Sequence, residues 1–96
     1  MTTANTETIR VIAFREADMW VAQCLEYDIS AQGIDFPTVV RRLSATLGCE
    51  ANYTTKKHGK AFATIDPAPE TFFDMFDAAE CEAMAAAENM SLKIAA

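Results

Sequence analysis

The sequence is poor in the residue types that most often carry chemistry. Its 96 residues include one histidine, three cysteines and three glycines. It has no glycine-rich loop to cradle a phosphate and no Ser-His-Asp arrangement. His58 stands in "KKHGK", where the adjacent lysines favour a neutral imidazole in a solvated loop over a general base. We therefore predict that the chain is not an enzyme, with no catalytic, cofactor-binding or metal-ligating residue.

Cysteine is too sparse for a disulfide framework. Cys24, Cys49 and Cys81 are odd in number and lie 25 and 32 residues apart, so they form neither a CxxC pair nor a secreted-type pattern. We expect buried free thiols in a reducing compartment. Cys24 has no neighbouring base to lower its pKa, so the sequence gives no reason to consider it a nucleophile.

Long apolar runs and an excess of basic residues are also missing. No run approaches the roughly 18 residues of a membrane helix, and "MTTANTETIR" lacks the basic and apolar regions of a signal peptide. A cytoplasmic protein without membrane contact is expected. The net charge of −6 argues against nucleic-acid binding and favours a basic protein partner.

Side chains in the N-terminal half alternate as they do along β-strands. Residues 1–7 are polar and expected to be disordered. Residues 8–16 and 19–25 predict a β-hairpin, and residues 29–32 a short third strand closed by Gly33. Apolar residues occupy both faces of the first two strands, so the sheet needs cover on two sides.

A helix is expected after Asp35, which suits the N-cap, with Pro37 tolerated in the first turn. From there the apolar residues recur at spacings of three and four, as in an amphipathic helix. The stripe consists of Phe36, Val39, Val40, Leu43, Leu47 and Ala51.

The C-terminal third predicts a second helix. Residues 61–66 suit either a fourth strand or an extended connection. "DPAPE" is a typical helix start with Pro69 in the first turn, and the Ala-, Met- and Glu-rich segment after it predicts a helix of up to about 20 residues. A heptad-like seam of apolar residues runs along this predicted helix, and we expect it to pack on this domain or on a twin subunit. The seam consists of Phe72, Phe76, Ala79, Ala83, Ala86 and Met90.

These elements predict a single α+β domain over residues 1–96 in the order β-β-β-α-(β)-α. Residues 8–66 would form the core, a small antiparallel sheet on one main helix, and residues 67–96 the C-terminal helix and tail. The second sheet face would be covered by that helix or by another subunit. A homo-oligomer, most simply a homodimer, is therefore expected.

Three carboxylates flank the third predicted strand. Glu26, Asp28 and Asp35 are spaced so that they could in principle converge on a metal. The simpler interpretation places Asp28 in a turn and Asp35 at the helix N-cap.

With the run "WVAQCLEYDISAQG" before the helix, the chain resembles the N-terminal domain of HicB-like antitoxins. The resemblance covers residues 8 to 55. The matching residues are Trp20, Val21, Ala22, Leu25, Gln32 and Gly33. The resemblance implies a truncated ribonuclease-H-like topology and a protein that occludes the RNA site of a small basic ribonuclease toxin. "IDFPTVV" departs from the family's usual helix start, and no DNA-binding region is recognisable near the C-terminus, so operator binding is not expected.

Two functions follow as expectations. The first is an antitoxin-type module that binds its partner through Glu26, Tyr27, Asp28 and Asp35. The alternative is a stand-alone homo-oligomer of the same fold that binds a small ligand or peptide and has no toxin. A two-metal nuclease is disfavoured because the first strand carries no inward carboxylate.

Overall fold

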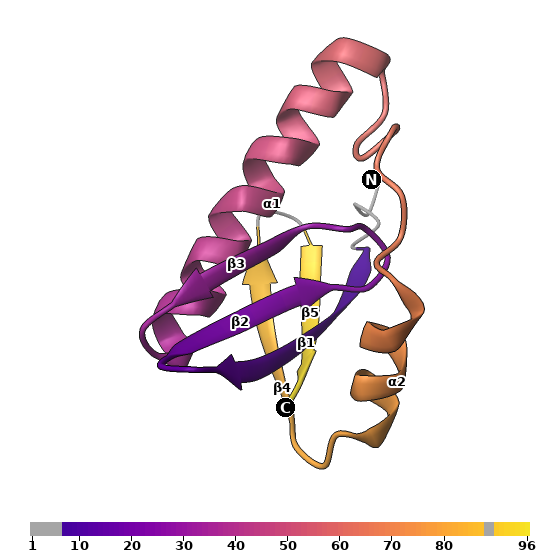
Figure 1. The fold of residues 1–96 in the computed structure, drawn as a ribbon. Helices are drawn as coiled ribbons and strands as arrows, with labels where there is room; N and C mark the ends of the chain where they lie inside the picture. The colour runs from indigo at the N-terminus through magenta and orange to yellow at the C-terminus, as the bar shows by residue number, and fades with distance from the viewer. Residues whose placement is uncertain (1–6, 88–89) are drawn as a thin grey trace, which may run out of the picture.

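Five strands and two helices make up the described residues, 7–87 and 90–96, of the computed structural model. The strands are β1 (Thr8–Glu16), β2 (Met19–Cys24), β3 (Ser30–Gly33), β4 (Glu82–Ala87) and β5 (Met90–Ala95), and the helices are α1 (Phe36–His58) and α2 (Glu70–Ala78). All strands join one mixed sheet in the order β3-β2-β1-β5-β4 (Figure 1). The predicted α+β class is confirmed.

The three N-terminal strands form as predicted. β1 and β2 pair antiparallel around a two-residue turn in which Ala17 has φ 56°, and β2 pairs antiparallel with β3. Residues 1–6 of the segment expected to be disordered lie outside the described residues. Glu7 belongs to the fold, because its carbonyl accepts a hydrogen bond of 2.9 Å from the Ser91 N–H.

Helix α1 begins and ends on local signals. Its N-cap is Asp35, whose carboxylate accepts the Thr38 N–H at 2.8 Å, which confirms the predicted cap. His58 lies in the last turn of the helix, so its expected place in a loop is wrong. The helix is capped by Gly59, which adopts φ 79° and donates its N–H to the Thr55 carbonyl. The buried stripe packs on one face of the sheet and consists of Val39, Leu43 and Leu47 against Ile9, Val11, Leu92 and Ile94.

The C-terminal third contradicts the predicted long helix. α2 has nine residues, and the rest of the segment forms β4 and β5. Ala83 and Ala86 therefore lie in β4 and Met90 in β5, so the seam from Phe72 to Met90 does not exist as one helical face. Alanine favours helix locally, but pairing of β5 in parallel with β1 overrides that preference.

Residues 61–64 form a turn, not a strand, and residues 65–69 belong to no helix or strand. Phe62 is buried with φ 61°, and its N–H donates to the Thr54 hydroxyl oxygen at 2.6 Å. This tertiary hydrogen bond holds the connection against the end of α1.

The second sheet face is covered by α2. Ile12 of β1, Leu25 and Ala95 are buried there against Phe72, Phe73, Met75, Phe76 and Ala79. The cover is partial, because no residue of α2 is fully buried. Neither described helix combines the length and apolar character needed to cross a lipid bilayer.

Gly33→Ala is expected to lower the free energy of unfolding by about 1–3 kcal/mol. A Cβ at Gly33 would lie 2.8 Å from the Val39 nitrogen and 3.0 Å from its Cα, so backbone would have to move. Denaturant unfolding measures the loss as a lower midpoint. Ser30→Ala on the same strand is the control, with a change within about 0.5 kcal/mol. Equal midpoints for Gly33→Ala and the wild type would contradict this packing.

Candidate protein-binding surface

The acidic bend, residues 26–28, connects β2 to β3 and is held by backbone hydrogen bonds. The Leu25 N–H donates to the Arg10 carbonyl at 2.9 Å, the Cys24 N–H to the Ile29 carbonyl at 2.9 Å, and the Ile29 N–H to the Tyr27 carbonyl at 2.7 Å. A bend tied at both ends presents its side chains in one arrangement.

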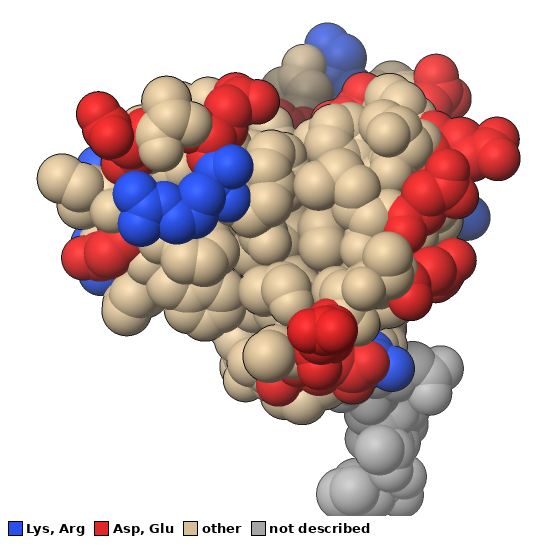
Figure 2. Space-filling view, turned by 60° about the horizontal axis from the view of Figure 1, so that its bottom comes forward, with Lys and Arg blue, Asp and Glu red and all other residues tan. Residues whose placement is uncertain are grey.

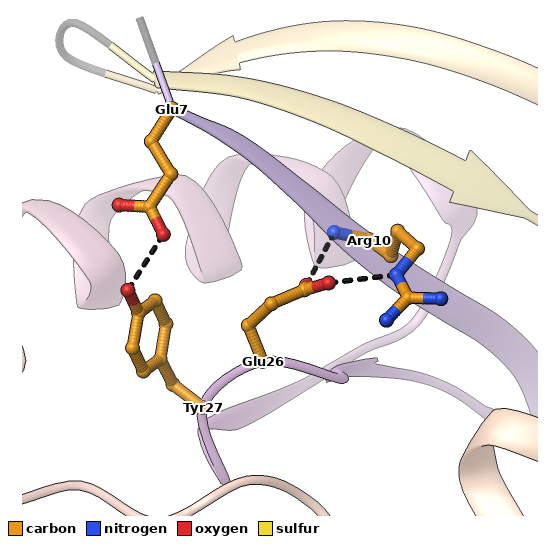
Figure 3. Close-up of polar contacts among 4 residues, drawn as sticks. All are labelled: Glu7, Arg10, Glu26 and Tyr27. Atoms are coloured by element: carbon orange, nitrogen blue, oxygen red, sulfur yellow. Dashed lines mark hydrogen bonds and ion pairs between the residues drawn. The ribbon is translucent and has the colours of Figure 1, made fainter.

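Glu26 is bound to Arg10 (Figure 3). Its carboxylate accepts the Arg10 backbone N–H at 2.8 Å and the Nε–H at 2.6 Å. The two side chains are 28% and 40% exposed, respectively, and an ion pair with that exposure contributes at most about 1 kcal/mol. Its main effect is to orient the guanidinium.

Arg10 connects the acidic bend to α2. Its guanidinium carbon lies 5.2 Å from the ring centre of Phe73 and 5.8 Å from that of Phe76, within the range of cation–π attraction. Glu26 of the bend is therefore linked through Arg10 to the surface of α2.

Tyr27 packs toward the 59–69 connection. Its ring stacks on Phe62 at 4.1 Å between centres, and its hydroxyl donates to Glu7 at 2.6 Å (Figure 3). Burial, the hydrogen bond to Glu7 and the charges of Glu7 and Glu26 raise the pKa of Tyr27 to about 12. The phenol is therefore neutral at physiological pH.

Asp28 and Asp35 do not share a site. Asp28 lies in the connection between β2 and β3, where it accepts a hydrogen bond of 3.0 Å from the buried Gln23 amide. Asp35 follows the far end of β3, where hydrogen bonds from Thr38 lower the pKa of its carboxyl. Of the four predicted partner-binding residues, only the three in the bend lie together.

The cysteines are partly as expected. Cys24 is buried, and burial with the nearby Glu26 charge raises the pKa of its thiol to about 12, which keeps it protonated. Cys49 and Cys81 are exposed, so the prediction that they are buried is wrong. Within the described residues, no group of three or more His, Cys, Asp or Glu side chains is placed to hold a metal.

An apolar surface lies beside the bend, on α2. Phe72, Phe73, Met75 and Phe76 are all only half-buried. Figure 2 shows a continuous uncharged surface bordered on one side by acidic side chains. The exposed acids of α2 are Glu70, Asp74 and Asp77.

Sequence reasoning missed Arg10, Phe73 and Met75. The signal for the two apolar residues was present, because "FFDMF" carries more large apolar side chains than one helical stripe needs. The contacts of Arg10 had no sequence signal, since they join segments 16 and more than 60 residues apart.

Comparison of the chain with protein-family models, curated proteins and solved structures finds no significant match.

Two of the three thiols are expected to react with a thiol reagent such as Ellman's reagent under native conditions. Cys49 and Cys81 are exposed, while Cys24 is buried and protonated. Absorbance of the released thiolate gives the count, and denaturant should release the third. In Cys24→Ala, the native count should stay the same and the denatured count should fall by one. Rapid modification of Cys24 in the folded wild type would refute this placement.

Tyr27→Phe is expected to flatten the loss of stability at alkaline pH. Because the folded-state pKa is raised from 10.0 to about 12, this contribution is complete below pH 10 and is lost as pH rises towards 12. Denaturant midpoints measured across this range for wild type and variant test it. Tyr53→Phe is the control, and a wild-type-like pH slope in Tyr27→Phe would contradict the assignment.

Proposed function

We propose that this chain is a HicB-like, antitoxin-type protein-binding module that occludes a small basic ribonuclease toxin. It acts by binding, without catalysis, in the cytoplasm. The observation that carries the proposal is the half-exposed apolar surface of α2 beside the acidic bend.

The composition of this surface suits a protein partner. Aromatic and Met side chains are typical of the centre of an interface, with charged residues at its rim. Here Phe72, Phe73, Met75 and Phe76 would form the centre. Glu70, Asp74 and Asp77, together with the acidic bend, would form the rim.

Charge supports a basic partner. The chain has a net charge of −6, and all three charged residues of α2 are acidic. Such a field accelerates the encounter with a basic protein and weakens with salt. The resemblance of residues 8 to 55 to HicB-like antitoxins supplies the class of that partner. A toxin covered in this way would lose access to RNA.

The alternative is a stand-alone protein of the same fold with no toxin. An antitoxin should have beside its gene a reading frame of about 60 to 80 codons for a basic protein, a length that encodes one small domain. A stand-alone protein should not. Absence of that frame, together with no protein recovered in a native pull-down, would reject the antitoxin proposal.

The double variant Asp74→Lys/Asp77→Lys tests the surface. Co-expressed with the neighbouring basic protein, the wild type should relieve its growth inhibition and bind it by calorimetry. The variant should bind at least tenfold more weakly, because two attractive charges become repulsive. Asp18→Lys, at the tip of the β1–β2 hairpin, reverses a charge elsewhere and should bind like the wild type. Equal affinity in all three would reject this surface.

A further inference from the structure

The two edges of the sheet are protected very differently. β3 is four residues long, its Gly33 is buried against α1, and the Arg42 guanidinium donates to the Gln32 carbonyl at 3.0 Å. A short strand with a capped carbonyl is a poor template for another strand. The β3 edge is therefore closed.

The β4 edge is open within the described residues. β4 pairs with β5 alone, and its sequence "EAMAAA" contains no proline, lysine or bulge. Glu82, Ala83, Met84 and Ala86 are exposed, and Met84 is 65% exposed. An unprotected edge of this length is rare in proteins that remain monomeric.

The hydrogen-bond pattern shows which backbone groups are free. Cys81 and Ala96 exchange both of their N–H···O bonds, at 3.2 and 2.9 Å. In an antiparallel pair such residues alternate with residues whose N–H and C=O groups point away from the partner strand. In β4 the outward groups therefore belong to Glu82, Met84 and Ala86, opposite Ala95, Lys93 and Ser91 of β5.

We propose that the β4 edge pairs antiparallel with β4 of a second copy of this chain, about a twofold axis at Met84. In this register Met84 faces Met84 of the second copy, and Glu82 of each copy faces Ala86 of the other, which makes three pairs. All three pairs join outward-pointing residues, so about six backbone hydrogen bonds form. The two sheets become one of ten strands.

Side chains and charges agree with this register. Ala83 lies opposite Ala85 on the α1 side, and the small side chains allow close approach. On the α2 side the two exposed Met84 side chains meet and lose water. The two Glu82 carboxylates are about 13 Å apart along the strands, so no like charges oppose each other. Each Glu82 also has Lys93 of its own chain at 3.7 Å.

This inference is independent of the toxin proposal, because the β4 edge lies outside the α2 surface assigned to that partner. It gives the predicted homodimer an interface other than the helical seam, which the fold rules out.

Two substitutions at Met84 test the pairing, with molar mass measured by light scattering from micromolar to near-millimolar concentration. The wild-type mass should rise from one chain to two. Met84→Lys places two ammonium groups opposite each other, and Met84→Pro removes an outward N–H that has no partner among residues 7–87 and 90–96. Both should stay monomeric, with dissociation constants raised at least a hundredfold and wild-type circular dichroism.

Ser30→Lys is the matched control, because it adds the same charge at an outward position of the β3 edge. It should dimerise like the wild type. Hydrogen exchange gives a second measurement: the Met84 and Ala86 amides should gain protection with concentration, while that of Gln32 should not. The proposal is overturned by a monomeric wild type at all concentrations, by dimerisation of both Met84 variants, or by dissociation of Ser30→Lys.

Discussion

The parallel pairing of β1 with β5 is the constraint on which the rest of the structure depends. It returns the C-terminal end of the chain to the side of its first strand and makes β1 the centre of the sheet. β1 buries Ile9 and Val11 under α1, and Ile12 on the opposite face under α2. Without β5, one edge of β1 would lose its hydrogen bonds and both apolar layers would lose a flank.

The same central strand organises the candidate binding surface. Arg10, between two buried residues of β1, reaches Glu26 in the acidic bend and the rings of Phe73 and Phe76 on α2. One residue thus joins an acidic loop and an apolar helix that are remote in sequence. α2 covers part of the sheet, and none of its nine residues is itself buried. This leaves the aromatic surface on which the functional proposal rests.

The two edges of the sheet differ in how well their backbone groups are protected. Arg42 and the buried Gly33 close the β3 edge, whereas Met84 lies on an edge that pairs with no further strand in the described part of the chain. The two proposals concern different surfaces of the chain, α2 for a basic partner and the β4 edge for a second copy. Part of the candidate site was predictable: Glu26, Tyr27 and Asp28 were identified from their place in a polar bend, but Asp35 was grouped with them and lies apart.

The sequence by itself determined the N-terminal half. Alternation defined β1 to β3, a period of three to four defined α1 as far as Ala51, and Asp35 defined its start, because these signals lie within a few residues of one another. Only the tertiary structure decided the C-terminal third. Its alanines favour helix locally, yet Ala83 and Ala86 lie in a strand because Leu92 and Ile94 of β5 complete the core beside β1. Arg10 likewise acquired its role only when distant segments met. The helix propensity of a residue contributes little free energy, and the burial of apolar side chains shared between remote strands outweighs it.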